Sequence, residues 1–482
     1  MLVLGIDVGT QGARALACDA AGNVLAEAEQ PFPLTTNPKL PEGWFEQDPE
    51  DWWNATEQVL RAVVCQLGDK KLDPVAIQGI SVTSTSGTVC AVRKDGRPLG
   101  LAIMYNDRRA ETEAEEINRV GADLARKLGY RFAASFALPK ILWLQRHEPK
   151  RFYNAAHFIS PTDFILGRLT GGYAETDYTN ALKTGYDLIE KRWPEFVGRD
   201  LQIPEGQLPR VVPPGTWIGS LARNGETGLP GGVKVLAGMT DGCASQVATG
   251  AVGLNQWNST LGTTLVIKGV TREIIRDPSG RVYCHRHPDG YWLPGGASNT
   301  GGECIARTFE PTKLDSLGST ALRLAPTNVI AYPLVKTGER FPFAHPKAEG
   351  FLIGDAIDEA TLFTAYLEGV GYVERLAYHV LENFGAEVSN EIHVAGGANK
   401  AAAWLQIRAD VLQKTLLVPT HSGAAMGAAI IAAGGTIHKG IVPAARAMVR
   451  IVTRVEPRRE RKAAYDERYN RFCTELRGRG YI

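Results

Sequence analysis

The stretch LVLGIDVGTQGARALACDAAGNVLAEAEQ, residues 2–30, decides the fold that the sequence predicts. Its first part, Leu2–Val8, is mostly apolar, as in a buried strand, and Gly9–Gly12 interrupts it with small residues. Ala13–Cys18 is again strand-like, and residues 19–23 carry a turn signal. We therefore expect a β-hairpin whose first turn has almost no side-chain bulk.

The first turn of this hairpin carries the groups of a phosphate cradle beside a carboxylate. Gly9 and Gly12 let backbone N–H groups approach a ligand closely, and Thr10 adds a hydroxyl. Asp7 stands at the strand end beside the turn, where a phosphate would repel it unless a cation lay between them. Asp7 is therefore interpreted as a carboxylate that faces Mg²⁺ or orients water. An ordinary hairpin with a turn aspartate is the alternative that the rest of the chain has to decide.

Length and charge limit the classes of protein. A chain of 482 residues exceeds what one core usually supports, so we expect two domains, residues 1–247 and 248–482. The 53 Lys and Arg against 52 Asp and Glu leave a formal net charge of +1, which gives no reason to expect a nucleic acid or an anionic membrane as partner.

The cysteines and the hydropathy pattern favour a cytoplasmic location. The seven cysteines are scattered and include no C-x-x-C pair, which is typical of reduced thiols. The first residues show no basic segment followed by an uninterrupted apolar one, and no apolar run reaches the roughly 18 residues of a membrane span.

Three further strand-like runs end in polar residues. Val75–Val82 leads into the hydroxyl-rich turn Thr83–Thr88, and Leu101–Arg109 reads as a strand with a charged end. Val233–Ala237 is followed by a tight turn, so Asp241 sits at a strand-to-helix corner. Ligands of α/β sheets bind just past the carboxyl ends of strands, so these turns are candidate ligand contacts.

The second half of the chain repeats this order of elements. Asn258–Ile267 places a Gly-Thr turn between two strand-like runs, as in the opening hairpin, which indicates a duplicated domain. The strand Ile392–Val394 opens into a glycine turn. Gly423–Gly435 has the small residues of a helix packed closely on a sheet, and the last 30 residues read as a solvated terminal helix.

Several common catalytic motifs are absent. The sequence has no Gly-Lys dipeptide, no H-R-D loop and no G-x-G-x-x-G after a strand, which excludes the P-loop, protein-kinase and dinucleotide-binding solutions. A G-x-S-x-G elbow is also missing, so a serine hydrolase is a poor alternative. Cys284, His285 and His287 are candidate zinc ligands, but neighbours on a strand point to opposite faces and no matching cluster appears elsewhere.

The ordered motifs resemble those of the FGGY family of carbohydrate kinases, within the actin- and hexokinase-like ATPase superfamily. The resemblance covers residues 2–435 and most of the tail. It implies an α/β fold of two ribonuclease-H-like (actin-like ATPase) domains flanking a deep cleft, with the sugar held mainly by the first and ATP by the second. The motifs are Asp7–Thr10, Glu46–Pro49, Asp107 with Arg109, Asp177–Ala181, Gly238–Ala244, Leu261–Thr264, Gly396–Ala398 and Gly427–Ala429.

The resemblance also implies roles for individual residues. Asp241 matches the family's catalytic aspartate, which takes the proton from the sugar hydroxyl as it attacks the γ-phosphate of MgATP, and Asp7 and Thr10 would assist it. Asp7 and Asp241 would face Mg²⁺ through water. The sugar contacts would be Asp7, Ser86, Asp107 and Asp241. The ATP contacts would be Gly9, Thr10, Gln11, Gly262, Thr263, Thr264, Gly302, Gly396, Gly397, Ala398 and Asn399.

The substrate expected from the resemblance is a pentulose. Ser84–Gly87 stands where xylulose kinases usually have G-Q-x-H-G, and with the motifs downstream it is more similar to the D-ribulose kinases of cyanobacterial and plant type. We therefore predict phosphorylation of D-ribulose to D-ribulose 5-phosphate. Tyr105 replaces the Trp of the family's W-x-D-x-R, so D-xylulose, xylitol, ribitol, erythritol and glycerol-like polyols stay open as substrates.

Two non-enzymatic alternatives also stay open, a sugar or nucleotide sensor without turnover and a nucleotide-driven conformational protein. Retention of Asp7, Thr10 and Asp241 together argues against the sensor. Asp241 and the full set of sugar-domain motifs would be unnecessary in a conformational protein. The expected partners are the small sugar and ATP, and the chain is expected to be a monomer or homodimer.

Overall fold

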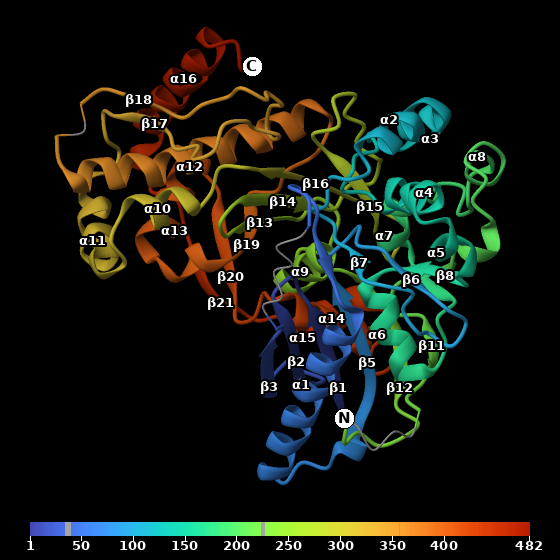
Figure 1. Cartoon of the computed structure of the whole chain (residues 1–482). Helices are drawn as coiled ribbons and strands as arrows, with labels where there is room; N and C mark the ends of the chain where they lie inside the picture. Colours follow the sequence, from blue (N-terminus) through green and yellow to red (C-terminus); the bar gives the residue numbers. More distant parts are fainter. Residues whose placement is uncertain (34–39, 223–226, 356) are drawn as a thin grey trace. The chain divides into compact units, whose positions relative to one another are not determined.

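The computed structural model of the protein describes residues 1–33, 40–222, 227–355 and 357–482. Two compact units are present (Figure 1). Unit 1 comprises residues 1–248, 285–290 and 421–449, and unit 2 comprises residues 249–284, 291–420 and 450–482. The two units therefore correspond to the first and second halves of the chain, with two exceptions. Residues 285–290 and 421–449 come after residue 247 in the sequence but belong to unit 1.

The predicted opening hairpin is confirmed. β1 (Leu2–Val8) pairs antiparallel with β2 (Gly12–Asp19), and β3 (Val24–Pro31) pairs antiparallel with β2. On its other side β1 pairs in parallel with β5 (Ile77–Ser84), and β12 (Lys234–Thr240) pairs in parallel with β5. With β11 (Trp217–Ser220) at the edge, the sheet order is β11-β12-β5-β1-β2-β3. Three parallel strands therefore end at one edge of the sheet.

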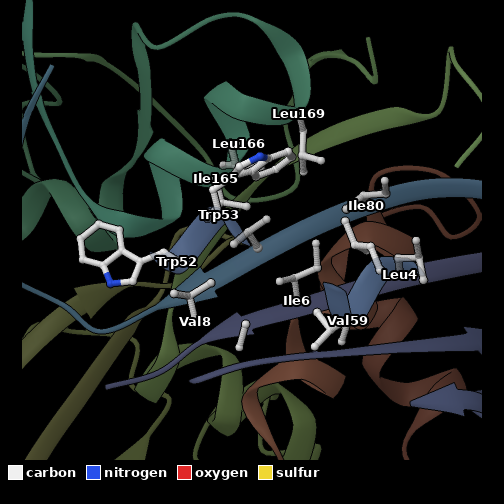
Figure 2. Packing of buried hydrophobic residues seen from close by; sticks show 14 of the residues in the cluster. Leu4, Ile6, Val8, Trp52, Trp53, Val59, Ile80, Ile165, Leu166 and Leu169 are labelled. Carbon is white, nitrogen blue, oxygen red and sulfur yellow. The ribbon is translucent and has the colours of Figure 1, made fainter. Parts of the chain in front are cut away.

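Alternation along β1 sorts its side chains between the two faces of this sheet. Leu4, Ile6 and Val8 point to the face that packs against Trp52 and Val59 of α1 (Pro49–Asp69), as Figure 2 shows. The same cluster includes apolar residues of α6 (Pro161–Thr170). Burial of this continuous apolar face is the main force that holds the sheet and the two helices together.

The opposite face of β1 is covered by α14 (Ala424–Gly434), which confirms the predicted packing of a small-residue helix on a sheet. A Cβ at Gly5 would lie 1.9 Å from the Ala425 carbonyl oxygen. A Cβ at Gly427 would lie 2.0 Å from the Ala244 carbonyl oxygen in α9 (Asp241–Thr249). Only glycines allow the backbone of α14 to approach the strand β1 and the helix α9 this closely.

Shorter elements complete unit 1. Its remaining helices are α2 (Glu111–Val120), α3 (Ala122–Leu128), α4 (Ala137–His147), α5 (Pro149–Asn154), α7 (Tyr178–Ala181), α8 (Glu195–Arg199) and α15 (Ile441–Met448). Two-stranded ribbons pair β4 (Glu46–Gln47) with β7 (Ala102–Ile103), β6 (Cys90–Val92) with β8 (His157–Ile159), and β9 (Glu175–Asp177) with β10 (Arg210–Val212).

Unit 2 repeats the strand arrangement of unit 1. β13 (Trp257–Leu261) and β14 (Leu265–Gly269) form the predicted second hairpin, and β16 (Trp292–Ser298) pairs antiparallel with β14. β19 (Glu391–Ala395) and β20 (Thr415–Pro419) extend the other side of β13 in parallel. In each unit, three antiparallel strands are thus followed by two parallel ones, so the predicted duplication is confirmed at the level of topology.

The edges and helices of unit 2 are as follows. β15 (Tyr283–Arg286) and β21 (Ile451–Val455) lie at the edges of the sheet, and β17 (Ile330–Tyr332) pairs with β18 (Phe351–Ile353). The helices are α10 (Glu303–Thr308), α11 (Leu314–Leu324), α12 (Glu359–Asn383), α13 (Ala402–Leu412) and α16 (Lys462–Gly478).

Two of the predicted elements are wrong in part. The expected strand over 101–109 is limited to β7, because the chain turns at Met104–Asp107, where the Asp107 N–H donates to the Met104 carbonyl oxygen at 3.1 Å. The terminal helix is not simply solvated. Tyr465, Tyr469 and Phe472 of α16 are buried, so one face of this charged helix belongs to the core of unit 2.

Candidate functional site

Three of the predicted site residues, Asp7, Ser86 and Asp241, lie at the edge of the sheet where β1, β5 and β12 end. The strand register sets Asp7 beside Thr83 of β5 and Thr240 of β12 beside Ser84. Asp241 is the first residue of α9, directly after β12, so its predicted strand-to-helix corner is confirmed. Asp7, Asp241 and the loop that follows β5 therefore share one edge of the sheet.

Asp7 is a buried carboxylate with unused hydrogen-bonding capacity. It is 8% exposed, and its Oδ1 finds no hydrogen-bond partner within the described parts of the chain. Burial first and the charge of Asp241 second raise its pKa from 3.8 to about 7, and the charge of Arg14 opposes this rise. An acceptor with these properties fits a bound hydroxyl or a hydrated cation.

The turn after β1 presents the predicted phosphate-loop residues to solvent. Thr10 and Gln11 are exposed, and the Gly9 N–H donates to the Gly12 carbonyl oxygen at 3.0 Å. Gln47 braces this turn because its Nε2 donates to the Thr10 carbonyl oxygen at 2.7 Å. The sequence motif Glu46–Pro49 includes Gln47 but does not indicate this contact, since Gln47 and Thr10 are far apart in the chain.

A network of hydroxyls and carboxylates anchors the corner at Asp241. The Thr240 N–H donates to Thr179 Oγ1 at 2.9 Å, and Thr179 Oγ1 donates to Asp177 Oδ1. The same carboxylate accepts the Thr179 N–H at 2.7 Å and the Asn180 side-chain amide. Asp177 and Thr179 thereby fix the backbone next to Asp241, a role that the sequence motif alone did not reveal.

The loop after β5 carries Ser86 in a tightly fixed backbone. Ser86 Oγ is buried and has no hydrogen-bond partner among the residues that the structure describes. Gly87 has φ +94°, and a Cβ there would lie 2.2 Å from the Ser135 carbonyl oxygen. Lys183 Nζ donates to the Ser86 carbonyl oxygen and Lys140 Nζ to that of Gly87, each at 3.1 Å. The free hydroxyl of Ser86 is thus held on a rigid loop.

A groove of about 410 Å³ lies beside this loop. Both Tyr105, which replaces the family's usual Trp, and Ser135 contribute to its wall. Its lining mixes polar and apolar groups and contains charges of both signs. The lining residues are Tyr105, Asn106, Asp107, Arg108, Glu111, Ala114, Glu115, Asn118, Arg131, Phe132, Ala133, Ala134 and Ser135.

Asp107 borders the groove but is engaged by protein groups. It is 1% exposed, accepts the Phe45 N–H at 2.6 Å and forms an ion pair with Arg109 at 2.7 Å. Arg109 in turn lies 3.8 Å from the centre of the Trp44 ring. Asp107 therefore fixes the base of the groove, and its direct contact with a sugar stays a prediction.

In unit 2 the second Gly-Thr turn lies against a second glycine turn. The Gly302 N–H donates to the Gly262 carbonyl oxygen at 2.8 Å, and the Glu303 N–H donates to that of Thr263 at 3.1 Å. A Cβ at Gly302 would lie 2.6 Å from the Gly262 oxygen. The structure therefore joins Gly302 to the Gly262–Thr264 turn, although some 40 residues separate them in the sequence.

The predicted adenosine loop follows β19, the neighbour of β13. Gly396 has φ +97°, and a Cβ there would lie 2.2 Å from the Leu261 carbonyl oxygen. A Cβ at Gly397 would meet no described atom within 4 Å. Asn399 Oδ1 is buried without a hydrogen-bond partner among the described residues, while Ala398 is buried. At this edge of the sheet the backbone of Gly396 thus lies close to Leu261, Gly397 borders open space, and Asn399 offers an acceptor.

The predicted site residues form two groups, one in each unit. Asp7, Thr10, Ser86, Asp107 and Asp241 belong to unit 1, and the residues from Gly262 to Asn399 belong to unit 2. In the part of the chain that the structure describes, no three His, Cys, Asp or Glu side chains cluster as metal ligands. Mg²⁺ typically uses one or two carboxylates together with substrate phosphates and water, so Asp7 and Asp241 fit this ion.

Among the described residues, none of the helices combines the length and apolar character needed to span a membrane. All seven cysteines are free, and only Cys65 is exposed.

Comparison with known proteins identifies the family. Residues 2–248 match the N-terminal domain, and residues 215–435 the C-terminal domain, of the FGGY family of carbohydrate kinases. The chain belongs to this family. Its fold is accordingly that of two actin-like ATPase domains, and ATP with Mg²⁺ is the usual cofactor of FGGY kinases.

Relatives of this FGGY kinase match along nearly the whole chain. The xylulose kinase of Bacillus subtilis is 29% identical over 448 residues, which cover 90% of this chain and 88% of the relative. The xylulose kinase of Escherichia coli is 28% identical over 446 residues, which cover 89% of each. Solved structures of a xyloylose kinase from Brucella ovis and a xylulose kinase from Rhodospirillum rubrum superpose with TM-scores of 0.89 and 0.87, each at 26% identity over 99% of both chains.

Proposed function

We propose that this FGGY kinase phosphorylates a ketopentose, with Asp241 as the general base. The observation that carries the proposal is the placement of Asp7 and Asp241 at the carboxyl edge of unit 1, where the charge of Asp241 contributes to the raised pKa of Asp7. Phosphoryl transfer needs a positioned base, a place for the cation and a phosphate cradle, and little covalent chemistry from the protein.

In the proposed reaction, Asp241 accepts the proton of the sugar hydroxyl while the hydroxyl oxygen forms a bond to the γ-phosphorus. The bond between this phosphorus and the bridging oxygen breaks, and the electron pair leaves with ADP. MgATP supplies the phosphoryl group and the charge that balances the phosphates. The anchor from Thr179 to the Thr240 N–H keeps Asp241 in place during the transfer.

Asp7 serves the same reaction as an acceptor beside the base. Its Oδ1, which has no hydrogen-bond partner among the described residues, can hold the sugar hydroxyl or a water of hydrated Mg²⁺. A cation here would lower the pKa of Asp7 by offsetting the repulsion from Asp241, so binding of MgATP and ionisation of Asp7 support each other.

The glycine turns of unit 2 fit the phosphates and the adenosine. The backbone of Gly262–Thr264 and Gly302 forms a cradle without bulky side chains, and the open space at Gly397 admits a base or ribose. Asn399 Oδ1 offers an acceptor to an adenosine donor.

D-xylulose is the first candidate for the ketopentose. The relatives that match about 90% of this chain are named xylulose kinases. Because D-xylulose and D-ribulose differ only in configuration at C3, one fold can serve either sugar with small changes in hydrogen bonding.

D-ribulose is the second candidate, and the loop after β5 favours it. Ser84–Gly87 stands where xylulose kinases usually carry G-Q-x-H-G. Lys140 and Lys183 hold the backbone of this loop, and the Ser86 hydroxyl has no hydrogen-bond partner among the described residues. A hydrogen-bonding site of this kind discriminates strongly between hydroxyl configurations, because the wrong epimer leaves the buried hydroxyl unpaired.

The test is a coupled ADP-release assay with MgATP and a panel of D-xylulose, D-ribulose, L-xylulose, L-ribulose, xylitol, ribitol, erythritol and glycerol. We expect kcat/KM to be highest for one of the two D-ketopentoses, and their ratio decides between the candidates. Turnover restricted to polyols would contradict a ketopentose kinase, and binding without turnover on every sugar would indicate a sensor.

Replacing Asp241 with Asn tests the base. We expect Asp241→Asn to lower kcat about 10²–10⁴-fold, because the proton loses its acceptor. Binding of MgADP, measured by calorimetry, should stay within about twofold of the wild type. The matched control is Asp123→Asn, whose side chain is 97% exposed. Turnover of Asp241→Asn near the wild-type rate would remove Asp241 from this role.

A further inference from the structure

Glu339 is a buried carboxylate, 4% exposed, whose two oxygens are both saturated with donors. Oε1 accepts two backbone N–H groups and Oε2 accepts three hydroxyls. The five donors are the N–H groups of Asn299 at 2.6 Å and Arg340 at 2.9 Å, and the hydroxyls of Ser298 at 2.8 Å, Thr300 at 3.0 Å and Tyr332 at 3.0 Å.

Three of these donors come from consecutive residues, Ser298–Thr300, between β16 and the glycine turn. The Thr300 carbonyl oxygen accepts the Leu265 N–H at 3.0 Å, directly after the Gly262–Thr264 turn. Gly302 then bonds to Gly262. Glu339 therefore holds both ends of the segment Ser298–Thr300, which lies against the second Gly-Thr turn.

We propose that Glu339 is a positioning residue for the nucleotide phosphates. It sets the backbone of Ser298–Thr300, and through this segment it holds the cradle made by Gly262–Thr264 and Gly302. The inference rests on the proposed nucleotide role of this cradle, and Glu339 itself contacts no nucleotide. A cradle of backbone N–H groups binds phosphate well only when its groups are held in place before binding, because flexible loops must be ordered at the expense of affinity.

The division of donors between the two oxygens predicts which substitution is tolerated. In Glu339→Gln the amide oxygen still accepts the two backbone N–H groups, and the NH₂ group can donate to hydroxyls that turn to accept. In Glu339→Ala all five donors lose their acceptor, and Ser298–Thr300 is free to move. Glutamine should therefore preserve the nucleotide binding that alanine weakens.

The experiment measures MgADP binding by calorimetry, and KM for ATP and for the better ketopentose, with full-length protein. We expect Glu339→Ala to raise the Kd of MgADP and KM for ATP at least tenfold, with KM for the sugar changed less than twofold. Glu339→Gln should stay within threefold of the wild type. An unchanged Kd in Glu339→Ala, or an equal rise in both KM values, would overturn the proposal.

A matched control separates positioning from loss of stability. Glu368, on α12, is another fully buried carboxylate of unit 2, which accepts hydrogen bonds from Thr327 and Tyr465. We expect Glu368→Ala to lower the melting temperature as much as Glu339→Ala but to leave the MgADP Kd within twofold. An equal loss of MgADP affinity in Glu368→Ala would reduce the effect at Glu339 to stability alone.

Two further variants keep the test decisive. If Glu339→Ala does not fold, Thr300→Val removes one buried donor with little change of volume and should raise the MgADP Kd at least threefold; an unchanged Kd would refute the inference. Gly397→Leu fills the open space in the loop after β19. A normal MgADP Kd in Gly397→Leu would overturn the proposed nucleotide site. If Gly397→Leu raised the MgADP Kd while Glu339→Ala or Thr300→Val left it normal, only the role of Glu339 would be overturned.

Discussion

Asp7 combines burial with a raised pKa. Burial and the neighbouring charge of Asp241 raise its pKa to about 7, so near neutral pH it exists in both protonation states. Arg14 offsets this only in part. A carboxylate that must be ionised to accept a hydroxyl or face a cation then makes activity depend on pH in the physiological range.

We expect kcat/KM to rise with pH between about 6 and 8 as Asp7 loses its proton. In Asp7→Asn the remaining activity should lack this acid limb, because Asn does not titrate. The matched control is Asp163→Asn, since Asp163 also has a pKa of about 7 but is engaged by Ser160 at the start of α6. The pH profiles of initial rates check this, and an unchanged acid limb in Asp7→Asn would assign the titration to another group.

The placement of Asp7 and Asp241 could be predicted from the sequence, because strand ends and turn residues are local signals. The residues that support them could not. Gln47 braces the first turn, Thr179 anchors the corner before Asp241, and Lys140 holds the loop of Ser86, each across a long separation in the chain. Hydrogen bonds between distant segments leave no periodic pattern, so only the fold reveals them.

The loop after β5 is an element whose backbone positions Ser86, a residue of the proposed sugar site. Gly87 has a positive φ, and a Cβ there would lie 2.2 Å from the Ser135 carbonyl oxygen. Gly171 has φ +83°, but a Cβ there would meet no described atom within 4 Å. Gly87→Ala and Gly171→Ala should thus share a strain of about 1–2 kcal/mol, and only Gly87→Ala should displace the loop that carries Ser86.

We therefore expect Gly87→Ala to raise KM for the ketopentose at least tenfold, with KM for ATP changed less than twofold. Gly171→Ala should lower the melting temperature but leave both KM values near those of the wild type. Steady-state kinetics and thermal unfolding of both variants measure this difference. Equal sugar KM values in the two variants would show that the approach to Ser135 does not position Ser86.

Elements with a plain local signal were predicted well, and elements that depend on burial were not. The hairpin β1–β2, the second hairpin β13–β14 and the small-residue helix α14 are confirmed. The strand expected over 101–109 shrinks to β7 because the chain turns at Met104–Asp107, and Asp107 is then buried in an ion pair with Arg109. The terminal helix α16 was expected to be solvated because charges mask its buried aromatic stripe.

For the chain as a whole, the repeated strand order matters more than any one motif. Both units place three antiparallel strands before two parallel ones, so each offers a hairpin turn and the carboxyl ends of parallel strands at one edge of its sheet. The sequence indicated the duplication through its two Gly-Thr turns. It did not show that residues 421–449 pack within unit 1, since that depends on contacts between the small residues of α14 and β1.

The stability of the chain should also depend on pH through its buried carboxyls. Asp163, 2% exposed, has its pKa raised from 3.8 to about 7 by burial first and by the charge of Asp177 second. The folded state therefore binds this proton more tightly than the unfolded chain. Its contribution favours folding at low pH and is lost as the pH rises through about 7.

Comparison with Asp163→Asn isolates this contribution from those of the other ionisable groups. Between pH 6 and pH 8 the wild type should lose about 1 kcal/mol of unfolding free energy relative to Asp163→Asn, because only the wild type must ionise a buried carboxyl. Thermal unfolding of both proteins at the two pH values measures the difference. If the melting temperature of the wild type rose relative to that of Asp163→Asn at pH 8, the hydrogen bonds of Ser160 would stabilise the Asp163 anion more than burial destabilises it.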